Sequence, residues 1–209
     1  MLFFHIKYII YKNYKMGMIA NMNRTKRRIF EKTMELFAKK GYEATSIEEI
    51  TAVVGVAKGT FYYHFETKEE IFNFLVEEGI KLFSNSVVVK TSKADTLFEK
   101  VKAIILVQIK IVMRYENFIR MIAGEMWGDE PRNIFCREAL FKYVDTIEAI
   151  ITEASEKEGK SVEDPKVLAD ALFGLLCSNL MYKLRNENCD INVLISDMES
   201  IVLKHIRIN

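Results

Sequence analysis

The chain has 209 residues and is 50% hydrophobic, so it is long enough to bury a core, either as one body or as a small domain joined to a larger one. Its formal net charge is +1, which excludes a protein that is basic over its whole surface. With only two prolines, nine glycines and long apolar stripes at helical spacing, the chain is expected to fold as two all-α domains without a sheet.

Residues 1–22 form an apolar, aromatic and basic N-terminal extension. Lys7 and Lys12 interrupt its apolar run, which is too short to span a bilayer, and it lacks the small-residue cleavage site of a secretory signal. We favour a start of translation at one of three methionines, the last of them Met22, over a functional extension. Residues 1–30 hold seven basic side chains and no acidic one. Such an arm can raise affinity for DNA in a salt-dependent way, or it can be a solvated tail.

A first helix is expected over residues 23–40, where apolar residues recur at helical spacing, and Gly41 provides its stop. This helix would brace the short helices that follow. The second helix begins at Thr45, whose hydroxyl forms a capping box with the carboxylate of Glu48. It ends at Gly55, which allows the left-handed backbone that a sharp corner needs.

A third, short helix follows this corner, with Val56, Phe61 and Phe65 as its core contacts. A capping box formed by Thr67 and Glu70 then starts a longer helix. The arrangement is that of a helix-turn-helix DNA-binding domain. A face rich in hydroxyls, with one Lys and one Gly, suits a helix that lies against a phosphate backbone and base edges. The residues left for this outer face are Lys58, Gly59, Thr60, Tyr62, Tyr63 and His64.

The segment from Thr45 to Leu75 resembles the DNA-binding domain of the TetR family of bacterial transcriptional repressors. The resemblance rests on three blocks in the family's order and spacing, IEEI, GVAKGT and FYYHF, and on the KE pair that follows them. Together with the preceding helix it covers roughly the first third of the chain. One departure is Ala57, where the family often carries a Ser that caps the recognition helix or touches phosphate. Losing that hydroxyl weakens a cap by about 1 kcal/mol.

The resemblance implies DNA contacts at the family's motif positions, and each residue type suits that role. Glycine lets the backbone approach the duplex, hydroxyls and a neutral imidazole donate to phosphate, and the Lys68 ammonium adds its charge to the positive end of a helix. The alternatives are that Tyr62 packs within the domain and that His64 is a partly buried core residue. The expected partner is double-stranded DNA, read by a dimer as a palindromic operator. The predicted contacts are Ser46, Lys58, Gly59, Thr60, Tyr62, His64 and Lys68.

After the helix-turn-helix domain at 23–70, residues 71–84 are expected to form a linker helix. Polar stretches between Ser84 and Lys93 mark the boundary to a larger helical ligand-binding and dimerisation domain at 85–209. Asp164 and Pro165 are suited to the start of a helix. The helices expected in this domain lie near 97–111, 115–127, 165–184 and 191–202, and Pro131 is well placed to open a further helix before the apolar positions at 140–154.

The helix at 165–184 is apolar on more than one face, which is more apolar surface than one monomer core needs. It can pack with the last helix and with the same pair from a second copy. The resemblance implies that these two C-terminal helices form a homodimer interface. No membrane association is expected.

The resemblance also implies a small-molecule pocket in the larger domain, whose ligand favours a spacing of the two DNA-binding domains that fits the operator poorly. Gln108 and Trp127 stand out because each brings a polar group to an apolar region. No Arg or Lys cluster interrupts the apolar faces, so the expected effector is hydrophobic or amphipathic. At helical spacing the same residues are also typical of ordinary core. The candidate lining residues are Phe98, Gln108, Met113, Phe118, Met121, Met126, Trp127, Phe141, Phe173, Cys177 and Met181.

Cys136, Cys177 and Cys189 show no CxxC spacing and do not cluster with the histidines, which indicates a reducing cytoplasm and no metal or cofactor. No GxSxG elbow, phosphate-binding Gly-rich loop or HExxH pair supports an enzyme. The sequence therefore predicts a cytoplasmic, dimeric DNA-binding repressor that a small ligand releases from its operator. The alternative is a DNA-binding regulator whose C-terminal domain binds a protein partner.

Overall fold

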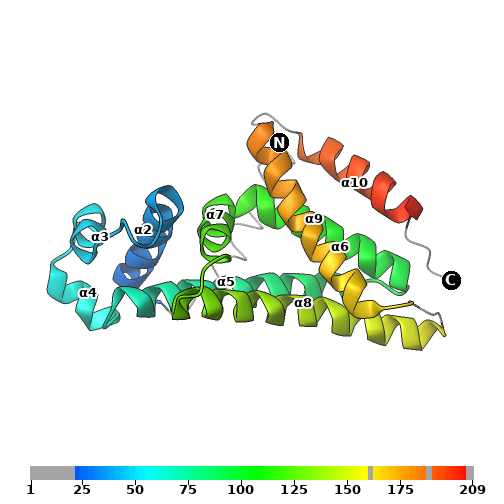
Figure 1. Ribbon diagram of the computed structural model, residues 1–209, viewed down its shortest axis with the longest axis horizontal. Coiled ribbons are helices and arrows are strands. Elements are labelled where there is room, and N and C mark those ends of the chain that lie inside the picture. Colours follow the sequence, from blue (N-terminus) through cyan, green and yellow to red (C-terminus); the bar gives the residue numbers. More distant parts are fainter. Residues whose placement is uncertain (1–21, 160–161, 187–189, 206–209) are drawn as a thin grey trace. The chain divides into compact units, whose positions relative to one another are not determined.

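The computed structural model describes residues 22–159, 162–186 and 190–205 (Figure 1). The all-helical class predicted from the sequence is confirmed for these residues. The extension before Met22 lies outside the described residues, as does Cys189. The helices are α2 (Arg24–Lys40), α3 (Ile47–Val54), α4 (Lys58–His64), α5 (Lys68–Thr91), α6 (Leu97–Arg114), α7 (Glu116–Glu125), α8 (Pro131–Glu158), α9 (Pro165–Arg185) and α10 (Ile191–His205).

The chain divides into two compact units. The head unit contains the described residues up to Leu82 together with Arg120–Arg137, and the body unit contains Phe83–Ile119 and the described residues from Glu138 onward. The head unit thus includes a segment that we had expected in the C-terminal domain. The functional limits at 70 and 84 remain a prediction.

Helix α5 is longer than the sequence suggested. It continues through the polar residues at 84–86 and ends at Thr91, so the prediction of a helix end near Phe83 was wrong. Phe83 and Val87 are both buried and lie one turn apart, so the apolar spacing continues past the serines. Thr91 Oγ1 donates to the carbonyl of Val87 at 2.9 Å near the end of the helix.

Helix α3 is capped by Ser46 and not by Thr45. Ser46 Oγ accepts a hydrogen bond from the backbone N–H of Glu49 at 3.1 Å. Thr45 is 1% exposed, and its hydroxyl donates to the carbonyl of Gly41 at 2.8 Å instead. The predicted capping box of Thr45 and Glu48 is therefore wrong, because packing inside the head unit engages the Thr45 hydroxyl.

The corner between α3 and α4 is confirmed. Gly55 has a φ of 73°, in the left-handed region that residues with a side chain rarely adopt. Ala57 precedes α4 without a side-chain cap, as its lack of a hydroxyl requires. Phe61 and Phe65 are buried, which holds one side of α4 against the head core and leaves its other side outward.

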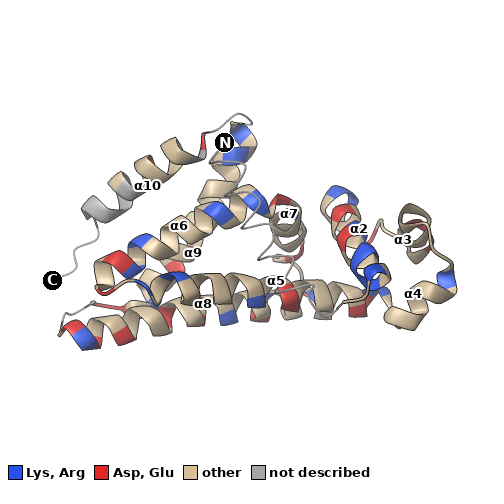
Figure 2. Cartoon of the chain, turned by 180° about the vertical axis from the view of Figure 1, so that it is seen from behind, with Lys and Arg blue, Asp and Glu red and all other residues tan. Residues whose placement is uncertain are grey.

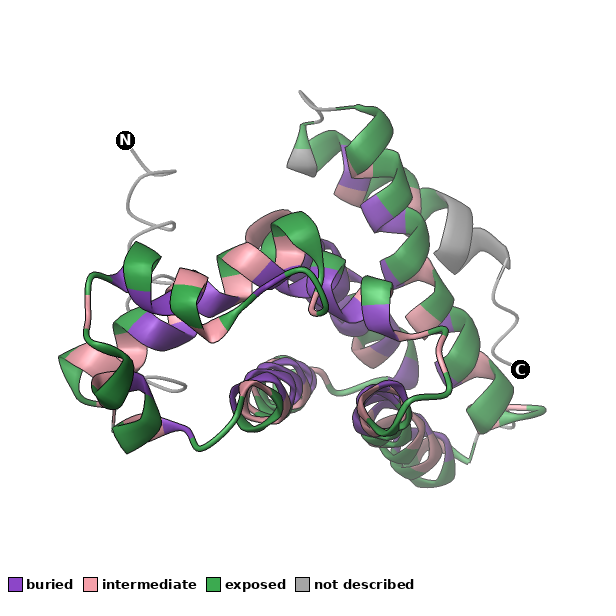
Figure 3. Ribbon diagram, turned by 60° about the vertical axis from the view of Figure 1, so that its left-hand side comes forward, coloured by how far each residue is buried: buried purple, intermediate pink, exposed green. Residues whose placement is uncertain are grey.

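In the body unit, α6 packs against both α9 and α10. Its buried residues are distributed around much of the helix. Figure 3 colours the chain by burial and shows buried positions interleaved with exposed ones along its helices. Asp164 caps α9 as predicted: Asp164 Oδ1 accepts from the backbone N–H of Lys166 at 2.9 Å and of Val167 at 3.1 Å, with Pro165 in the first turn.

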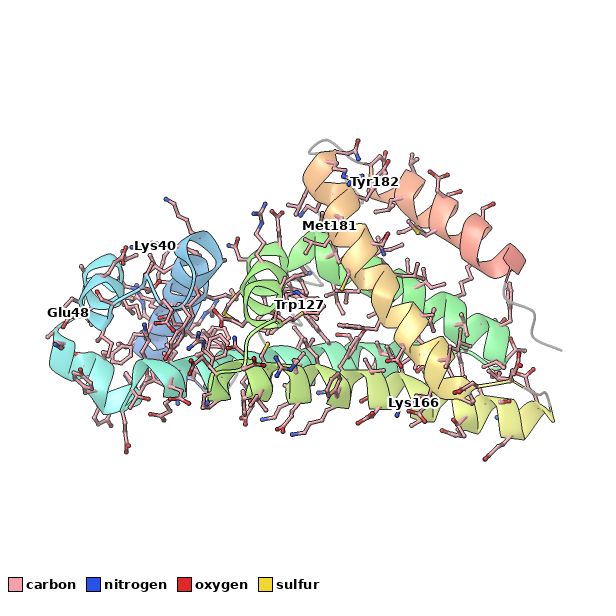
Figure 4. All side chains as sticks on the ribbon, in the orientation of Figure 1. Lys40, Glu48, Trp127, Lys166, Met181 and Tyr182 are labelled. Carbon is pink, nitrogen blue, oxygen red and sulfur yellow. The ribbon has the colours of Figure 1, made fainter. Side chains whose placement is uncertain are left out.

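Helix α9 keeps apolar side chains on its outer side. Val167 is 62% exposed, Met181 52% and Tyr182 42%, and Figure 4 labels the last two near the C-terminal end of the helix. With a mean hydropathy of 1.4 over its most apolar window, α9 is also the one described helix that could cross a bilayer by length and composition. Core helices of compact domains share this composition, and α9 packs along α6 through buried residues such as Leu172 and Leu176.

Candidate DNA-binding face and ligand site

Helix α4 carries most of the predicted DNA contacts on its outer side. Lys58 and Gly59 are exposed, Tyr62 is 44% exposed, and Thr60 and His64 are half-buried. No atom lies within 4 Å of a methyl group built at Gly59, so the first turn of α4 is open to a close approach. The helix has one Lys or Arg and no acidic residue (Figure 2). Five of the predicted contacts therefore share one helix that can face a phosphate backbone.

The Lys58 ammonium is paired with the carboxylate of Glu48 on α3. A hydrogen bond from Lys58 lowers the pKa of Glu48, and the same pairing raises the pKa of Lys58. The ammonium also lies 6.0 Å from the centroid of the Tyr62 ring. Both partners of this ion pair are more than half exposed, so the pair is weak and can exchange for a phosphate. Glu48, labelled in Figure 4, is a competitor for Lys58 that we did not identify from the sequence.

Ser46 and His64 keep a donor available at the edges of this face. The Ser46 oxygen accepts a hydrogen bond from the backbone N–H of Glu49, and its hydroxyl can donate, as it does to the Glu48 carboxylate, where it helps to lower the pKa of that group. Burial lowers the pKa of His64, and the nearby Lys26 charge lowers it further. The imidazole is therefore neutral near pH 7 and retains one N–H donor.

Lys68 is turned toward the head unit's own backbone. Its ammonium donates to the carbonyl of Tyr42 at 2.9 Å and to that of Thr45 at 3.0 Å, and it lies 4.1 Å from the centroid of the Tyr42 ring. These contacts join the start of α5 to the loop between α2 and α3. This placement gives the ammonium a structural role in the head unit, unlike the phosphate contact predicted from its motif position.

Arg132, at the start of α8, lies on the same aromatic ring. Its guanidinium carbon is 4.1 Å from the centroid of the Tyr42 ring, and its nitrogens pair with Glu125 at 2.8 Å and with Glu43 at 3.0 Å. The Arg132 side chain is 14% exposed and the Glu125 side chain 11%. The sequence offered no signal for this group, because its members come from segments about ninety positions apart in the chain.

The turn between α7 and α8 is fixed by side chains of α8. The Asn133 amide donates to the carbonyl of Glu125 at 3.0 Å and to its carboxylate at 2.9 Å. Arg137 donates to the carbonyls of Met126 and Gly128. A methyl group at Gly128 would lie 2.2 Å from the side-chain oxygen of Asn133, so this tight turn requires a glycine.

The candidate ligand-lining residues are divided between the two units. Five of the eleven are exposed, with Trp127 at 86%, Phe141 at 60%, Met181 at 52% and Phe98 at 42%, together with Cys177. Met121, Met126 and Trp127 belong to the head unit, whereas the other candidates belong to the body unit. The interior of the body unit retains Gln108 and Phe118, with Met113 and Phe173 half-buried.

Gln108 is one of three buried side chains of the body unit whose polar atoms have no hydrogen-bond partner among the described residues, and the other two, Tyr143 and Asn179, are absent from the predicted set. Both amide atoms of Gln108 and of Asn179, and the hydroxyl of Tyr143, are buried without a hydrogen-bond partner. The Tyr143 ring lies 6.3 Å from the centroid of Phe83 and 6.4 Å from that of Phe173. Burial raises the pKa of Tyr143, so its hydroxyl stays protonated and can donate. A few polar groups among aromatic side chains can orient a small ligand.

Comparison with known proteins agrees with the geometry of the head unit. Residues 29–74 match the family model described as "Bacterial regulatory proteins, tetR family". The chain is 50% identical over 50 residues to YerO of Bacillus subtilis, an uncharacterized HTH-type transcriptional regulator. This match covers 24% of the chain and only 17% of YerO.

Solved structures match most of the chain. The "Clostridium perfringens putative fatty acid metabolism regulator" is 32% identical, with a TM-score of 0.79 over 87% of this chain and 100% of that chain. The transcriptional regulator FadR from Bacillus subtilis, solved in complex with stearoyl-CoA, shares the fold at 21% identity, with a TM-score of 0.75 over 87% of this chain and 99% of that chain. The helix-turn-helix geometry, the family match and this near-complete likeness together show that the chain belongs to the TetR family of DNA-binding transcriptional regulators.

Proposed function

We propose that this protein is a cytoplasmic, homodimeric transcriptional repressor that binds a palindromic operator and is released from it by a small hydrophobic or amphipathic ligand. The observation that carries the proposal is α4, whose buried side anchors it in the head core while its outer side presents an open glycine, hydroxyls and one ammonium. Such a surface suits phosphate contacts beside base edges in a major groove.

The proposed contacts keep six of the seven positions predicted from the sequence. Lys68 is left out because its ammonium is already engaged by two carbonyls of the head unit. The Glu48 carboxylate must release the Lys58 ammonium when a phosphate takes its place. The proposed set is Ser46, Lys58, Gly59, Thr60, Tyr62 and His64.

Dimerisation is supported by the outer side of α9. A single short recognition helix reads few base pairs, so a palindrome requires two copies held at a fixed spacing. Exposed Val167, Met181 and Tyr182 provide apolar surface that a second copy can bury. We expect Met181→Glu to shift the protein from dimer to monomer in light scattering, whereas Phe141→Glu, an exposed apolar position on α8, leaves the dimer intact. Equal effects of the two substitutions would argue against this interface.

Ligand control is supported by the buried polar group in the body unit. Gln108, Tyr143 and Asn179 offer donors and acceptors in an otherwise apolar interior. The FadR regulator that shares this fold was solved with stearoyl-CoA, a ligand with a long apolar chain. We therefore favour a small amphipathic effector over a protein partner for the body unit.

The test is binding of the purified protein to the DNA upstream of its own gene, measured by mobility shift at two salt concentrations with non-specific competitor. We expect a competitor-resistant shift at dimer stoichiometry. Lys58→Ala should weaken binding and reduce the slope of log affinity against log salt by about 0.9, the contribution of one phosphate contact.

Tyr62→Phe removes one hydroxyl from the proposed face and should also weaken binding. Tyr63→Phe is the matched control, because Tyr63 is 82% exposed on the same helix and is not a proposed contact. Circular dichroism checks that each variant is folded. If Tyr63→Phe lost more affinity than Tyr62→Phe, the assignment of the docking side of α4 would be wrong.

A further inference from the structure

Three side chains of the body unit bury polar atoms that no group in the described chain satisfies. They are Gln108 on α6, Tyr143 on α8 and Asn179 on α9, and each is 0% exposed. Buried donors and acceptors in native proteins are nearly always paired, because an unpaired one carries its full desolvation penalty. Three such residues in one unit indicate a site whose partner is not part of the chain.

The three side chains come from helices that meet in the body interior. Helices α6 and α9 pack along each other, and Asn179 continues the buried stripe of Leu172 and Leu176 on α9. The Gln108 amide is near enough to the Tyr143 hydroxyl to offset part of the rise in its pKa, although the two groups do not reach hydrogen-bond geometry. Aromatic rings on α5 and α9 flank Tyr143. The polar atoms of these side chains therefore lie among apolar and aromatic side chains.

The charge around this group indicates which ligands it accepts. One turn beyond Asn179, the Lys183 ammonium is already paired with the Glu116 carboxylate at 2.5 Å. The Arg114 guanidinium lies 5.5 Å from the centroid of the Tyr115 ring at the end of α6. The polar atoms of the group itself are two amides and a hydroxyl, which are uncharged and include both donors and acceptors. A carboxylate placed against these uncharged atoms would lose its hydration without gaining an ion pair from them.

We propose that Gln108, Tyr143 and Asn179 bind an uncharged carbonyl or hydroxyl group on an otherwise apolar ligand, such as a fatty amide, ester, thioester or alcohol. The corresponding free carboxylate binds poorly at the same site. This inference rests on the proposed function and specifies the chemistry of its effector.

The test uses the full chain with decanamide, 1-decanol and decanoic acid near neutral pH, with affinity measured by calorimetry and melting followed by circular dichroism. We expect the two neutral ligands to bind at least roughly tenfold more tightly than decanoate. Tyr143→Phe and Gln108→Leu should each weaken decanamide binding roughly fivefold or more, the loss of about one hydrogen bond. Both should also raise the melting temperature of the free protein, because each removes an unpaired buried polar group.

Thr33→Val is the matched control. Thr33 on α2 is 0% exposed and its hydroxyl oxygen is also buried without a partner, but it lies in the head unit. This variant should melt higher and bind decanamide as the wild type does. The proposal is overturned if decanoate binds as tightly as decanamide or if no ligand of the series binds. It is also overturned if the body variants lower the melting temperature and leave affinity unchanged.

A mobility shift with operator DNA distinguishes the proposal of ligand-controlled release from the proposal on ligand chemistry. Decanamide binding that leaves the DNA complex intact would reject ligand-controlled release while supporting the ligand chemistry. A specific DNA complex together with no ligand binding would reject the ligand chemistry and leave the DNA-binding function in place.

Discussion

Replacing Lys68 with Met should destabilise the head unit. The Lys68 ammonium donates to the carbonyls of Tyr42 and Thr45 at 2.9 and 3.0 Å and lies on the Tyr42 ring. Hydrogen bonds with a charged partner contribute roughly 1.5–3 kcal/mol each. The side chain is half-buried, and Met keeps much of its apolar stem, so we expect a net loss of about 2–3 kcal/mol in the free energy of unfolding.

The assay is urea unfolding followed by circular dichroism. With a slope of about 2 kcal/mol/M, this loss lowers the midpoint by roughly 1–1.5 M urea. Lys81→Met is the control on the same helix, because Lys81 is 63% exposed in a surface pair with Glu78 and should change stability by less than about 0.5 kcal/mol. A Lys68→Met protein with wild-type stability but weaker, less salt-dependent operator binding would refute this reasoning and restore Lys68 as a phosphate contact.

Glu48→Gln should raise operator affinity, because it frees the Lys58 ammonium for a phosphate, and fluorescence anisotropy can measure this change. Unchanged affinity at low salt would show that the Glu48 carboxylate does not compete with DNA for Lys58. Gly128→Ala should lower the free energy of unfolding by about 1–3 kcal/mol, because the added methyl group would lie 2.2 Å from the side-chain oxygen of Asn133 on α8. By contrast, Gly124 lies in open space within α7, so Gly124→Ala should raise the free energy of unfolding by about 0.5–1 kcal/mol. Thermal melts of both variants compare the two effects. Cys136 is 0% exposed and burial raises its pKa to about 12, so a variant with Cys136 as its sole cysteine should react with a thiol reagent at pH 8 only on unfolding.

The sequence by itself determined the local features of this protein. The corner at Gly55, the exposed side of α4 and the Asp164 cap of α9 each depend on residues that lie within one or two turns of one another. Periodicity and backbone preference act over this range, so the all-helical class and the helix-turn-helix could be predicted from neighbouring residues. The family resemblance depends on the same short motif.

Tertiary structure decided which of several equivalent residues perform each task. Thr45 and Ser46 are both good caps by type, and only the burial of the Thr45 hydroxyl leaves Ser46 as the cap. A lysine at the start of α5 could face phosphate or its own domain, and two carbonyls from a distant loop engage it. Long-range contacts of this kind have no signature in sequence spacing.

The candidate ligand site shows most clearly that long-range packing cannot be predicted from sequence spacing. Trp127 and Gln108 looked alike in the sequence, since each places a polar group among apolar residues. In the structure Trp127 is 86% exposed, whereas Gln108 is fully buried, as are Tyr143 and Asn179. Helical spacing determines which residues share a face, but packing against other helices decides whether that face is inside. The chain's sequence therefore predicted its helices and its DNA-binding motif, and only tertiary packing decided which polar groups are buried in the interior.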